Sequence, residues 1–194
     1  MLTAGILGFI LMLLYDINSY TINCRLLRPG FCAGSLLVGG AMLTACLRAG
    51  QEAAYGGAAD AVLLLLSAGW LAALIYCLFF ALPFEKTYTM PENGRAVYSA
   101  GAYALCRHPG VLCFWGMSLC LGLAALPADL LKMCLLYSLL NTLYAYFQDR
   151  VTFPRTFCNY EKYRNIVPFL FPNAHSIARA KRTWGCQYGK EEPL

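Results

Sequence analysis

Five long stretches of the chain carry almost no charged side chains. The hydrocarbon core of a bilayer is roughly 30 Å thick, and a helix of about 20 apolar residues crosses it. Because a backbone inside lipid has to satisfy its own hydrogen bonds, we expect these stretches to be helices. The pattern predicts an all-α integral membrane helical bundle of about five transmembrane helices, at residues 1–18, 31–47, 61–83, 110–127 and 130–147.

The polar parts of the sequence are short, so residues 1–194 are interpreted as a single membrane domain. The first stretch has neither the basic start nor the small-residue cleavage site of a signal peptide, and we expect it to remain as a helix. The tail Gln148–Asn173 has an amphipathic pattern in which Tyr160 and Tyr163, three residues apart, would share one helix face. We therefore predict a C-terminal amphipathic helix after the last transmembrane helix.

Composition and charge agree with a membrane location and predict its orientation. Hydrophobic residues make up 59% of the chain and charged residues 13%, whereas a soluble domain has about 25% charged residues. Alternate loops hold 13 and 2 of the 15 Lys and Arg residues. Because cytosolic loops are enriched in Lys and Arg, the N-terminus is predicted outside and the tail in the cytosol. The net charge of +5 is then a topology signal. Nucleic acid is not an expected partner, because the basic residues form no patch with stacking aromatic side chains.

The ten cysteines include no CxxC pair. Cys106, Cys113 and Cys120 repeat every seven residues and would share one helix face, which is compatible with a metal or redox stripe. We favour the reading of small apolar residues at a helix contact, because zinc sites use closer ligand spacing and usually include histidine. No metal site is predicted.

Polar residues from separate parts of the chain are expected at one membrane surface. The fourth and fifth stretches are similar in length and joined by a short turn, so Arg107 and His108 should lie at the depth of Gln148 and Asp149. A helix that begins at Pro109 has free N–H groups that favour an anionic ligand. Ionisable residues near membrane depth are functional candidates. Tyrosines in the flanking loop and tail should lie on the same side, namely Tyr98, Tyr103, Tyr160 and Tyr163.

The segment Gly101-Ala102-Tyr103-Ala104-Leu105-Cys106-Arg107-His108-Pro109 carries a recognisable motif. It resembles the GxYxxxRHP signature of the isoprenylcysteine carboxyl methyltransferase and phospholipid methyltransferase family of integral membrane enzymes. The tail matches that family in order and spacing, with Tyr160-Glu161-Lys162-Tyr163 and then Val167-Pro168…Pro172. The resemblance covers about Gly94–Asn173, and the first three stretches match only as hydrophobic spans.

The resemblance implies methyl transfer from S-adenosylmethionine to a lipidic acceptor, such as an isoprenylcysteine carboxylate or a phospholipid, at the cytosolic interface. The implied cofactor region is 94–173. The implied cofactor-binding residues, with Tyr98 added from the neighbouring loop, are Tyr98, Tyr103, His108, Pro109, Gly110, Val111, Gln148 and Asp149. The candidate catalytic residues are Arg107, His108 and Asp149, and Tyr160 and Tyr163 are candidate substrate contacts. Membrane lipids and a lipidic substrate are the expected partners.

The chain departs from the family pattern at four positions. Val111 and Cys113 stand where the family usually has Tyr and Gly, and Gln148-Asp149 stands where it usually has Glu-Glu. A glutamine forms hydrogen bonds but supplies no charge, so Asp149 has to provide the negative charge of this pair.

Two other functions stay open. Membrane sterol and steroid reductases have a similar C-terminal arrangement, with an RHP-like motif, an Asp after the next helix and a tyrosine-rich VP…P tail, and they bind NADPH. These reductases are typically longer than this chain. A non-catalytic membrane protein that retains the fold is the third possibility. The three hypotheses differ in the cofactor that they expect to bind. The methyltransferase would bind S-adenosylmethionine, the reductase would bind NADPH, and the non-catalytic protein would bind neither.

Overall fold

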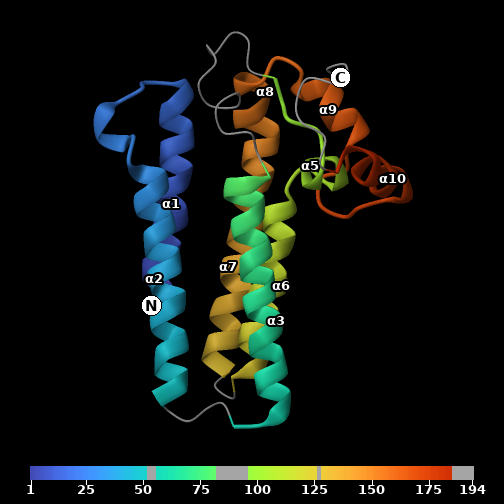
Figure 1. Ribbon diagram of the computed structural model, residues 1–194. Coiled ribbons are helices and arrows are strands. Elements are labelled where there is room, and N and C mark those ends of the chain that lie inside the picture. Colours follow the sequence, from blue (N-terminus) through green and yellow to red (C-terminus); the bar gives the residue numbers. More distant parts are fainter. Residues whose placement is uncertain (52–55, 82–95, 126–127, 185–194) are drawn as a thin grey trace. The chain divides into compact units, whose positions relative to one another are not determined.

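A computed structural model of the protein describes residues 1–51, 56–81, 96–125 and 128–184 (Figure 1). Every regular element in these ranges is helical. The chain divides into two compact units, which are described separately. Unit 1 comprises Met1–Leu71 and Phe114–Gln148, and unit 2 comprises Ala72–Cys113 and Asp149–Leu194.

The long helices coincide with the five apolar stretches. They are α1 (Leu2–Tyr20), α2 (Gly30–Gln51), α3 (Ala58–Ile75, extended by the π-helical turn Tyr76–Phe80), α6 (Pro109–Ala124) and α7 (Ala128–Phe147). The short elements are the 3₁₀ turn Arg25–Leu27, α5 (Ala102–Leu105), the π-helical turn Gln148–Thr152, α8 (Phe153–Thr156), α9 (Tyr160–Ile166) and α10 (Ala174–Thr183).

In the described residues, four helical runs are long and apolar enough to cross a membrane, as the predicted all-helical membrane bundle requires. These runs are Leu2–Tyr20, Arg25–Gln51, Ala58–Phe80 and Ala128–Thr156. The remaining apolar helix, Pro109–Ala124, has 16 residues. The total of five transmembrane helices therefore stays a prediction, as does their orientation.

The tail differs from a single amphipathic helix. The predicted segment 148–173 contains the π-helical turn, α8 and α9, and α10 begins only at Ala174. The predicted C-terminal amphipathic helix is thus not confirmed as such. Residues 82–83 and 126–127 of two predicted spans, and residues 94–95 of the predicted cofactor region, lie outside the described residues.

Unit 1 is held together by a close contact between α1 and α2 and by packing of α7. A Cβ atom added at Gly8 would lie 2.6 Å from the Gly34 carbonyl oxygen, so only glycine allows the two backbones to approach this closely. Phe9 and Val38 are buried nearby. From α7, the buried Tyr137 donates a hydrogen bond to the carbonyl oxygen of Met1 at 2.9 Å.

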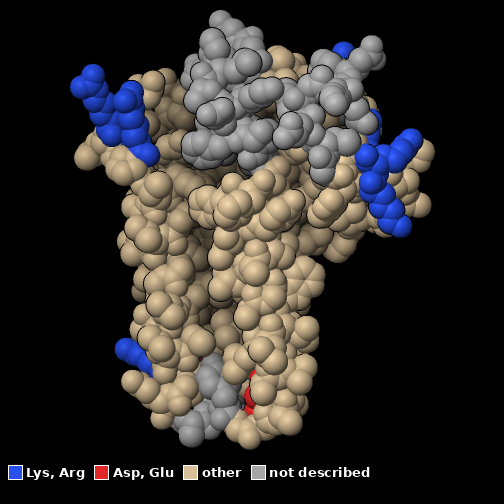
Figure 2. Space-filling model, in the orientation of Figure 1, with Lys and Arg blue, Asp and Glu red and all other residues tan. Residues whose placement is uncertain are grey.

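The outer surface of the long helices is apolar. Leu36 and Leu65 are 77% and 74% exposed, which is unfavourable in water but suits contact with lipid. On the face that Figure 2 shows, almost no charged side chains lie along these helices. In unit 1 basic side chains gather near the α1–α2 connection, where Arg25 and Arg28 lie in the sequence. The described surface of these helices is therefore suited to contact with lipid.

In unit 2, the short helices α5 and α10 pack against each other. The turn before α5 has Gly101 at φ 58°, a conformation that glycine adopts without steric cost. The Gly101 N–H donates to Thr183 Oγ1 of α10 at 3.0 Å, and Val97 N–H donates to Asn159 Oδ1 at 2.7 Å. These bonds connect the segment before the RHP residues to the tail.

Candidate functional site

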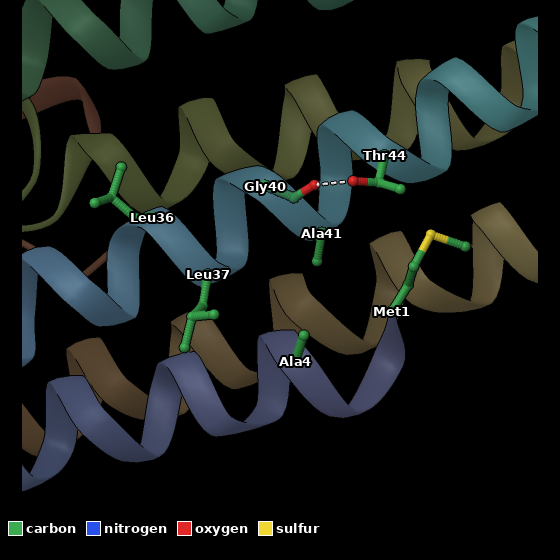
Figure 3. Close-up of a pocket in the computed structure, with 7 residues that line it drawn as sticks. All are labelled: Met1, Ala4, Leu36, Leu37, Gly40, Ala41 and Thr44. Carbon is green, nitrogen blue, oxygen red and sulfur yellow. Dashed lines mark hydrogen bonds between the residues drawn. The ribbon is translucent and has the colours of Figure 1, made fainter.

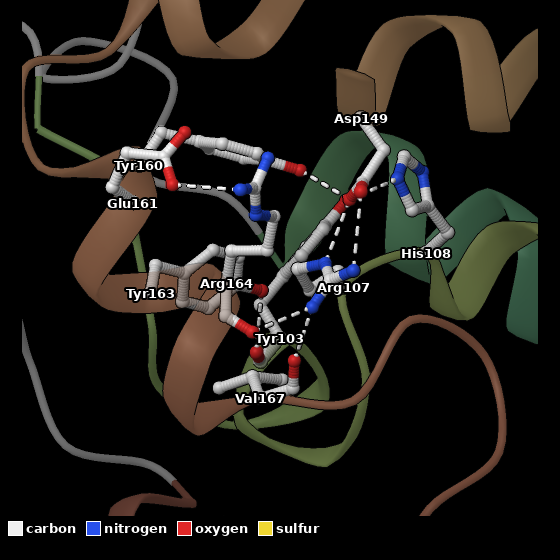
Figure 4. Close-up of polar contacts among 9 residues, drawn as sticks. All are labelled: Tyr103, Arg107, His108, Asp149, Tyr160, Glu161, Tyr163, Arg164 and Val167. Atoms are coloured by element: carbon white, nitrogen blue, oxygen red, sulfur yellow. Dashed lines mark hydrogen bonds and ion pairs between the residues drawn. The ribbon is translucent and has the colours of Figure 1, made fainter.

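The centre of the candidate site is a buried ion pair between Arg107 and Asp149 (Figure 4). Arg107 Nε lies 2.7 Å from Asp149 Oδ1, and Nη2 lies 3.1 Å from Oδ2, so the pair is bidentate. The side chains are only 9% and 2% exposed. Bidentate Arg–carboxylate pairs combine charge with fixed geometry and are among the stronger hydrogen-bonded contacts in proteins. This contact joins residues 42 positions apart in the sequence.

Arg107 also binds the end of α9. Its Nη1 donates to the carbonyl oxygens of Arg164 and Val167, at 2.8 and 2.6 Å. The last carbonyls of a helix have no partner within the helix, and a cation there is also favoured by the helix dipole. In addition, the backbone N–H of Arg107 donates to the Pro168 carbonyl oxygen at 2.9 Å. Arg107 therefore fixes the RHP segment to the tail through both its side chain and its backbone.

Asp149 receives a further hydrogen bond from the tail. Tyr160 Oη donates to Asp149 Oδ1 at 2.5 Å, and both residues are almost fully buried. Burial, followed by the hydrogen bond to Asp149, raises the pKa of Tyr160 well above its usual range. The phenol therefore stays protonated at physiological pH and continues to donate to the carboxylate. Asp149 lies in the π-helical turn Gln148–Thr152, and such turns are frequent at functional sites.

His108 lies beside the same carboxylate, enclosed by aromatic rings. Its ring stacks on Phe153 with centroids 5.7 Å apart and meets Phe169 edge-on at 5.1 Å. Nε2 is buried and lies 3.4 Å from Asp149 Oδ1. This distance lies within the range of an ion pair to a protonated imidazole. Nε2 nevertheless forms no hydrogen bond with any of the described residues. Among the side chains Arg107, His108, Asp149 and Tyr160, His108 Nε2 is thus a buried nitrogen that lacks a hydrogen bond to the described residues.

The two other tyrosines of the motif and tail are bonded to backbone. Tyr163 Oη donates to the Tyr103 carbonyl oxygen at 2.7 Å, and Tyr103 Oη donates to the Cys77 carbonyl oxygen at 3.0 Å. Burial raises the pKa of Tyr163 well above its usual range. Burial likewise raises the pKa of Cys106 to about 12, which keeps it a thiol. Since the thiolate is the nucleophilic form, Cys106 is unsuited to covalent catalysis.

Gln148 belongs to a different set of contacts, within unit 1. Its Nε2 donates to Asp16 Oδ2 and to Tyr144 Oη, at 2.9 Å in each case. Asp16 is only 4% exposed and lies in α1. Sequence reasoning missed this contact, although Asp16 is the first charged residue of the chain and interrupts its first apolar stretch. An ionisable residue in such a stretch is itself a signal of a functional or structural polar contact.

The structure therefore brings together part of the predicted site. Arg107, His108, Asp149 and Tyr160 form one cluster, called here the Arg107–Asp149 cluster. The other candidates contact it less directly or lie in packing positions. Val111 is 6% exposed, a Cβ on Gly110 would be 3.5 Å from a Leu74 methyl carbon, and Tyr98 is half-buried in the segment before α5.

An apolar pocket of about 320 Å³ opens between α1 and α2 of unit 1 (Figure 3). Its lining residues are Met1, Ala4, Leu36, Leu37, Gly40, Ala41 and Thr44. None of the predicted site residues lines it. Within the described ranges, no three His, Cys, Asp or Glu residues are grouped in a way that would hold a metal ion.

Comparison with known proteins gives no family assignment: no protein-family model, curated protein or solved structure matches the chain. Any function therefore has to rest on the motif residues and on the geometry described above.

The cluster can be tested for its fit to S-adenosylmethionine, a cation that also carries a carboxylate and an ammonium group. The charge of the Asp149 carboxylate is already balanced by Arg107, whereas the buried Nε2 of His108 forms no hydrogen bond with the described residues. Aromatic rings of Phe153 and Phe169 border that nitrogen. His108 Nε2 is therefore the atom of the cluster that would contact such a ligand, with Asp149 beside it.

Proposed function

We propose that the protein is a membrane methyltransferase that uses S-adenosylmethionine to methylate a lipidic acceptor, an isoprenylcysteine carboxylate or a phospholipid headgroup. The site would lie at the cytosolic end of the membrane helices, with the N-terminus outside. The observation that carries the proposal is the convergence of Arg107, His108, Asp149 and Tyr160. They come from three separate segments and form one buried polar cluster, which includes His108 and Asp149, two of the residues to which the GxYxxxRHP resemblance assigns the cofactor.

The roles of the residues follow from their contacts. Methyl transfer is an in-line displacement that depends mainly on alignment of the reactants and on exclusion of water. The cofactor, when bound, supplies the methyl group. Arg107 and Tyr160 orient the Asp149 carboxylate, and the aromatic rings around His108 limit the access of water to Nε2. A carboxylate acceptor needs no base, whereas an amine acceptor has to lose a proton, which His108 Nε2 is placed to accept.

Two alternatives are each favoured by one observation. The contact of Tyr160 with Asp149 joins the two features that sterol and steroid reductases share with this chain, an Asp after the last long helix and a tyrosine-rich tail. The four side-chain hydrogen bonds of Arg107 to groups within the protein favour a structural role for that residue, as in a non-catalytic protein that retains the fold. The cofactor that binds distinguishes these alternatives from the methyltransferase.

The experiment is a calorimetric titration of the purified full-length protein in detergent with S-adenosylmethionine and, separately, with NADPH. His108→Ala and Asp149→Asn are the test variants, and thermal unfolding checks that each is folded. Asp129→Asn is the matched control, because the Asp129 side chain is 92% exposed and pairs with Lys132 of its own helix at 3.0 Å. A lost charged hydrogen bond corresponds to a roughly ten-fold or larger loss of affinity.

The proposal expects saturable binding of S-adenosylmethionine that both test variants weaken and the control leaves unchanged. Binding of NADPH alone would move the assignment to the reductase. A folded protein that binds neither cofactor would identify the cluster as structural and end the enzyme hypothesis.

A further inference from the structure

Two buried cysteines from separate helical segments of unit 2 lie in contact. Cys77 belongs to the π-helical turn Tyr76–Phe80 that continues α3, and Cys113 lies near the start of α6. The two residues pack in one small cluster with Ala102 and are only 5% and 7% exposed. A hydrogen bond joins their thiols, and both cysteines are free of disulfides.

The contact follows from the close approach of the two segments. A Cβ atom added at Gly110 would lie 3.5 Å from a methyl carbon of Leu74 and 3.8 Å from one of Leu78. These two leucines flank Cys77 along the helix, and Gly110 lies about one turn before Cys113. The start of α6 is therefore within van der Waals reach of the turn that carries Cys77, and backbone packing sets the distance between the sulfurs.

This pair differs from the cysteine repeat in the sequence. Cys106 follows α5 in an extended conformation, so the predicted helix face shared by Cys106, Cys113 and Cys120 is wrong for Cys106. Cys106 is nevertheless fully buried and close enough to Cys77 and Cys113 to interact with both electrostatically. Across the described ranges, no three His, Cys, Asp or Glu residues are arranged to hold a metal ion. The contact therefore favours the chemistry of two neighbouring thiols.

We propose that Cys77 and Cys113 are a redox-active dithiol, which a two-electron oxidant such as hydrogen peroxide converts into a disulfide between the end of the α3 run and the start of α6. Disulfides in intracellular proteins are typically transient and serve catalysis or redox sensing. This inference does not depend on the methyltransferase proposal, because neither sulfur belongs to the Arg107–Asp149 cluster.

The oxidation proceeds in two steps. One sulfur, as the thiolate, attacks a peroxide oxygen, the O–O bond breaks, and a sulfenic acid and hydroxide form; the hydroxide takes up the thiol proton and becomes water. The second sulfur then attacks the sulfenic sulfur, the S–S bond forms, and the sulfenic oxygen leaves as a second water. Each cysteine sulfur loses one electron, and the peroxide gains two.

The neighbouring thiol determines the product of oxidation. A sulfenic acid without a thiol beside it is oxidised further to the irreversible sulfinic acid, whereas a thiol in contact with it gives a reversible disulfide. Burial limits access to the pair, so the oxidant has to be small and uncharged, as hydrogen peroxide is. The disulfide closes a loop over residues 77–113, which includes Arg107 and His108, and thereby restricts the unfolded chain.

The test treats the purified full-length protein in detergent with hydrogen peroxide and then alkylates the remaining thiols. Mass spectrometry of a non-reduced digest should identify one main linkage, between Cys77 and Cys113, that dithiothreitol removes. The unfolding midpoint of the oxidised protein should rise by roughly 5–10 °C. Phenylarsine oxide, whose arsenic binds two neighbouring thiols together, should protect both cysteines from alkylation without any oxidation.

The variants Cys77→Ser and Cys113→Ser should each lose the linkage and the rise in midpoint, and the remaining cysteine should accumulate as sulfinic acid. Cys134→Ser is the matched control, because it makes the same substitution at a fully buried position in unit 1. It should leave the yield of the linkage unchanged. Thermal unfolding of the reduced proteins checks that each variant is folded.

Three outcomes would overturn the proposal. Wild-type protein in which Cys77 and Cys113 are oxidised only to sulfinic acid would show that the two sulfurs do not react with each other. A linkage of Cys113 to Cys106 would assign the reactive pair to other residues. Equal protection by phenylarsine oxide in wild type and in Cys77→Ser would show that the reagent does not bridge this pair.

Discussion

Gln148 and Asp149 are adjacent in the sequence but belong to two different polar clusters. Gln148 donates to Asp16 and Tyr144 within unit 1, whereas Asp149 accepts from Arg107 and Tyr160 within unit 2. The first contacts link a carboxylate to a neutral amide, and the second link a carboxylate to a guanidinium. Two neighbouring residues that resemble one acidic motif therefore make different contacts, because successive residues of a helical segment point in directions about 100° apart.

The largest expected difference between the clusters comes from Arg107→Ala. This change leaves the Asp149 carboxylate buried without its cation and leaves the Arg164 and Val167 carbonyl oxygens without a donor. We expect a loss of about 3–5 kcal/mol in the free energy of unfolding, measured by thermal or chemical unfolding in detergent. Arg164→Ala is the control: it breaks an ion pair whose Glu161 side chain is 62% exposed and should cost about 1 kcal/mol or less. Equal losses in both variants would refute the central role of Arg107.

The contact between Gln148 and Asp16 can be tested by moving the negative charge from position 16 to position 148. Gln148→Glu alone places a second carboxylate beside buried Asp16, and we expect a loss of about 2–3 kcal/mol. The double variant with Asp16→Asn again has one carboxylate and one amide, now at positions 148 and 16, respectively. Most of the lost free energy of unfolding should therefore be recovered. A double-mutant cycle on unfolding free energies should then give a coupling of about 1–2 kcal/mol. Additive effects would mean that these two side chains do not interact as described.

A smaller contrast separates the two buried tyrosines of α9. Tyr160→Phe removes a hydrogen bond to a carboxylate, so it should cost about 2 kcal/mol, because hydrogen bonds to charged groups contribute more than neutral ones. Tyr163→Phe removes a bond to the neutral Tyr103 carbonyl and should cost about 1 kcal/mol. Paired unfolding measurements compare the two directly. A larger effect at Tyr163 would contradict the ranking of the contacts.

The smallest expected effect is on alkaline stability. Tyrosines in the unfolded chain ionise near pH 10, whereas burial holds the pKa of Tyr160 and of Tyr163 above that value in the folded protein. The unfolded state therefore releases protons first, so stability is complete below about pH 10 and falls as the pH rises further. Tyr163→Phe should flatten this fall, as seen in unfolding midpoints measured against pH. An unchanged slope would show that Tyr163 ionises equally in both states.

The hydrophobic pattern predicted the helices well because chain length and apolarity are sufficient for a membrane helix. The helices α1, α2 and α7 begin and end within a few residues of the predicted spans, although α2 ends at Gln51, beyond the predicted 31–47. The helical run that contains α7 continues to Thr156, past the predicted end at 147. Helix ends depend on local backbone geometry, which hydropathy does not encode. The pattern could not show that the tail is divided into short helices, because that division depends on packing.

The candidate site could be predicted as a set of residues but not as a set of contacts. The sequence put forward Arg107 and His108 from the motif and Asp149 from the position after the last long helix, and the structure brings these three together. The sequence could not show that Arg107 binds backbone carbonyl oxygens, because every residue has such an oxygen and only the fold selects two of them. The pairing of Gln148 with Asp16 was missed for a related reason, since the partners are 132 residues apart and share no motif.

The length of α6 has a consequence for the surrounding lipid. Its 16 residues correspond to about 24 Å at 1.5 Å per residue, which is less than the roughly 30 Å of an average hydrocarbon core. If α6 crosses the membrane as the sequence predicts, the bilayer around it thins locally or flanking side chains snorkel, and the elastic cost of thinning falls as the acyl chains become shorter. On that prediction, hydrophobic mismatch at α6 favours thin bilayers, and acyl-chain length becomes a variable that controls the stability of the protein.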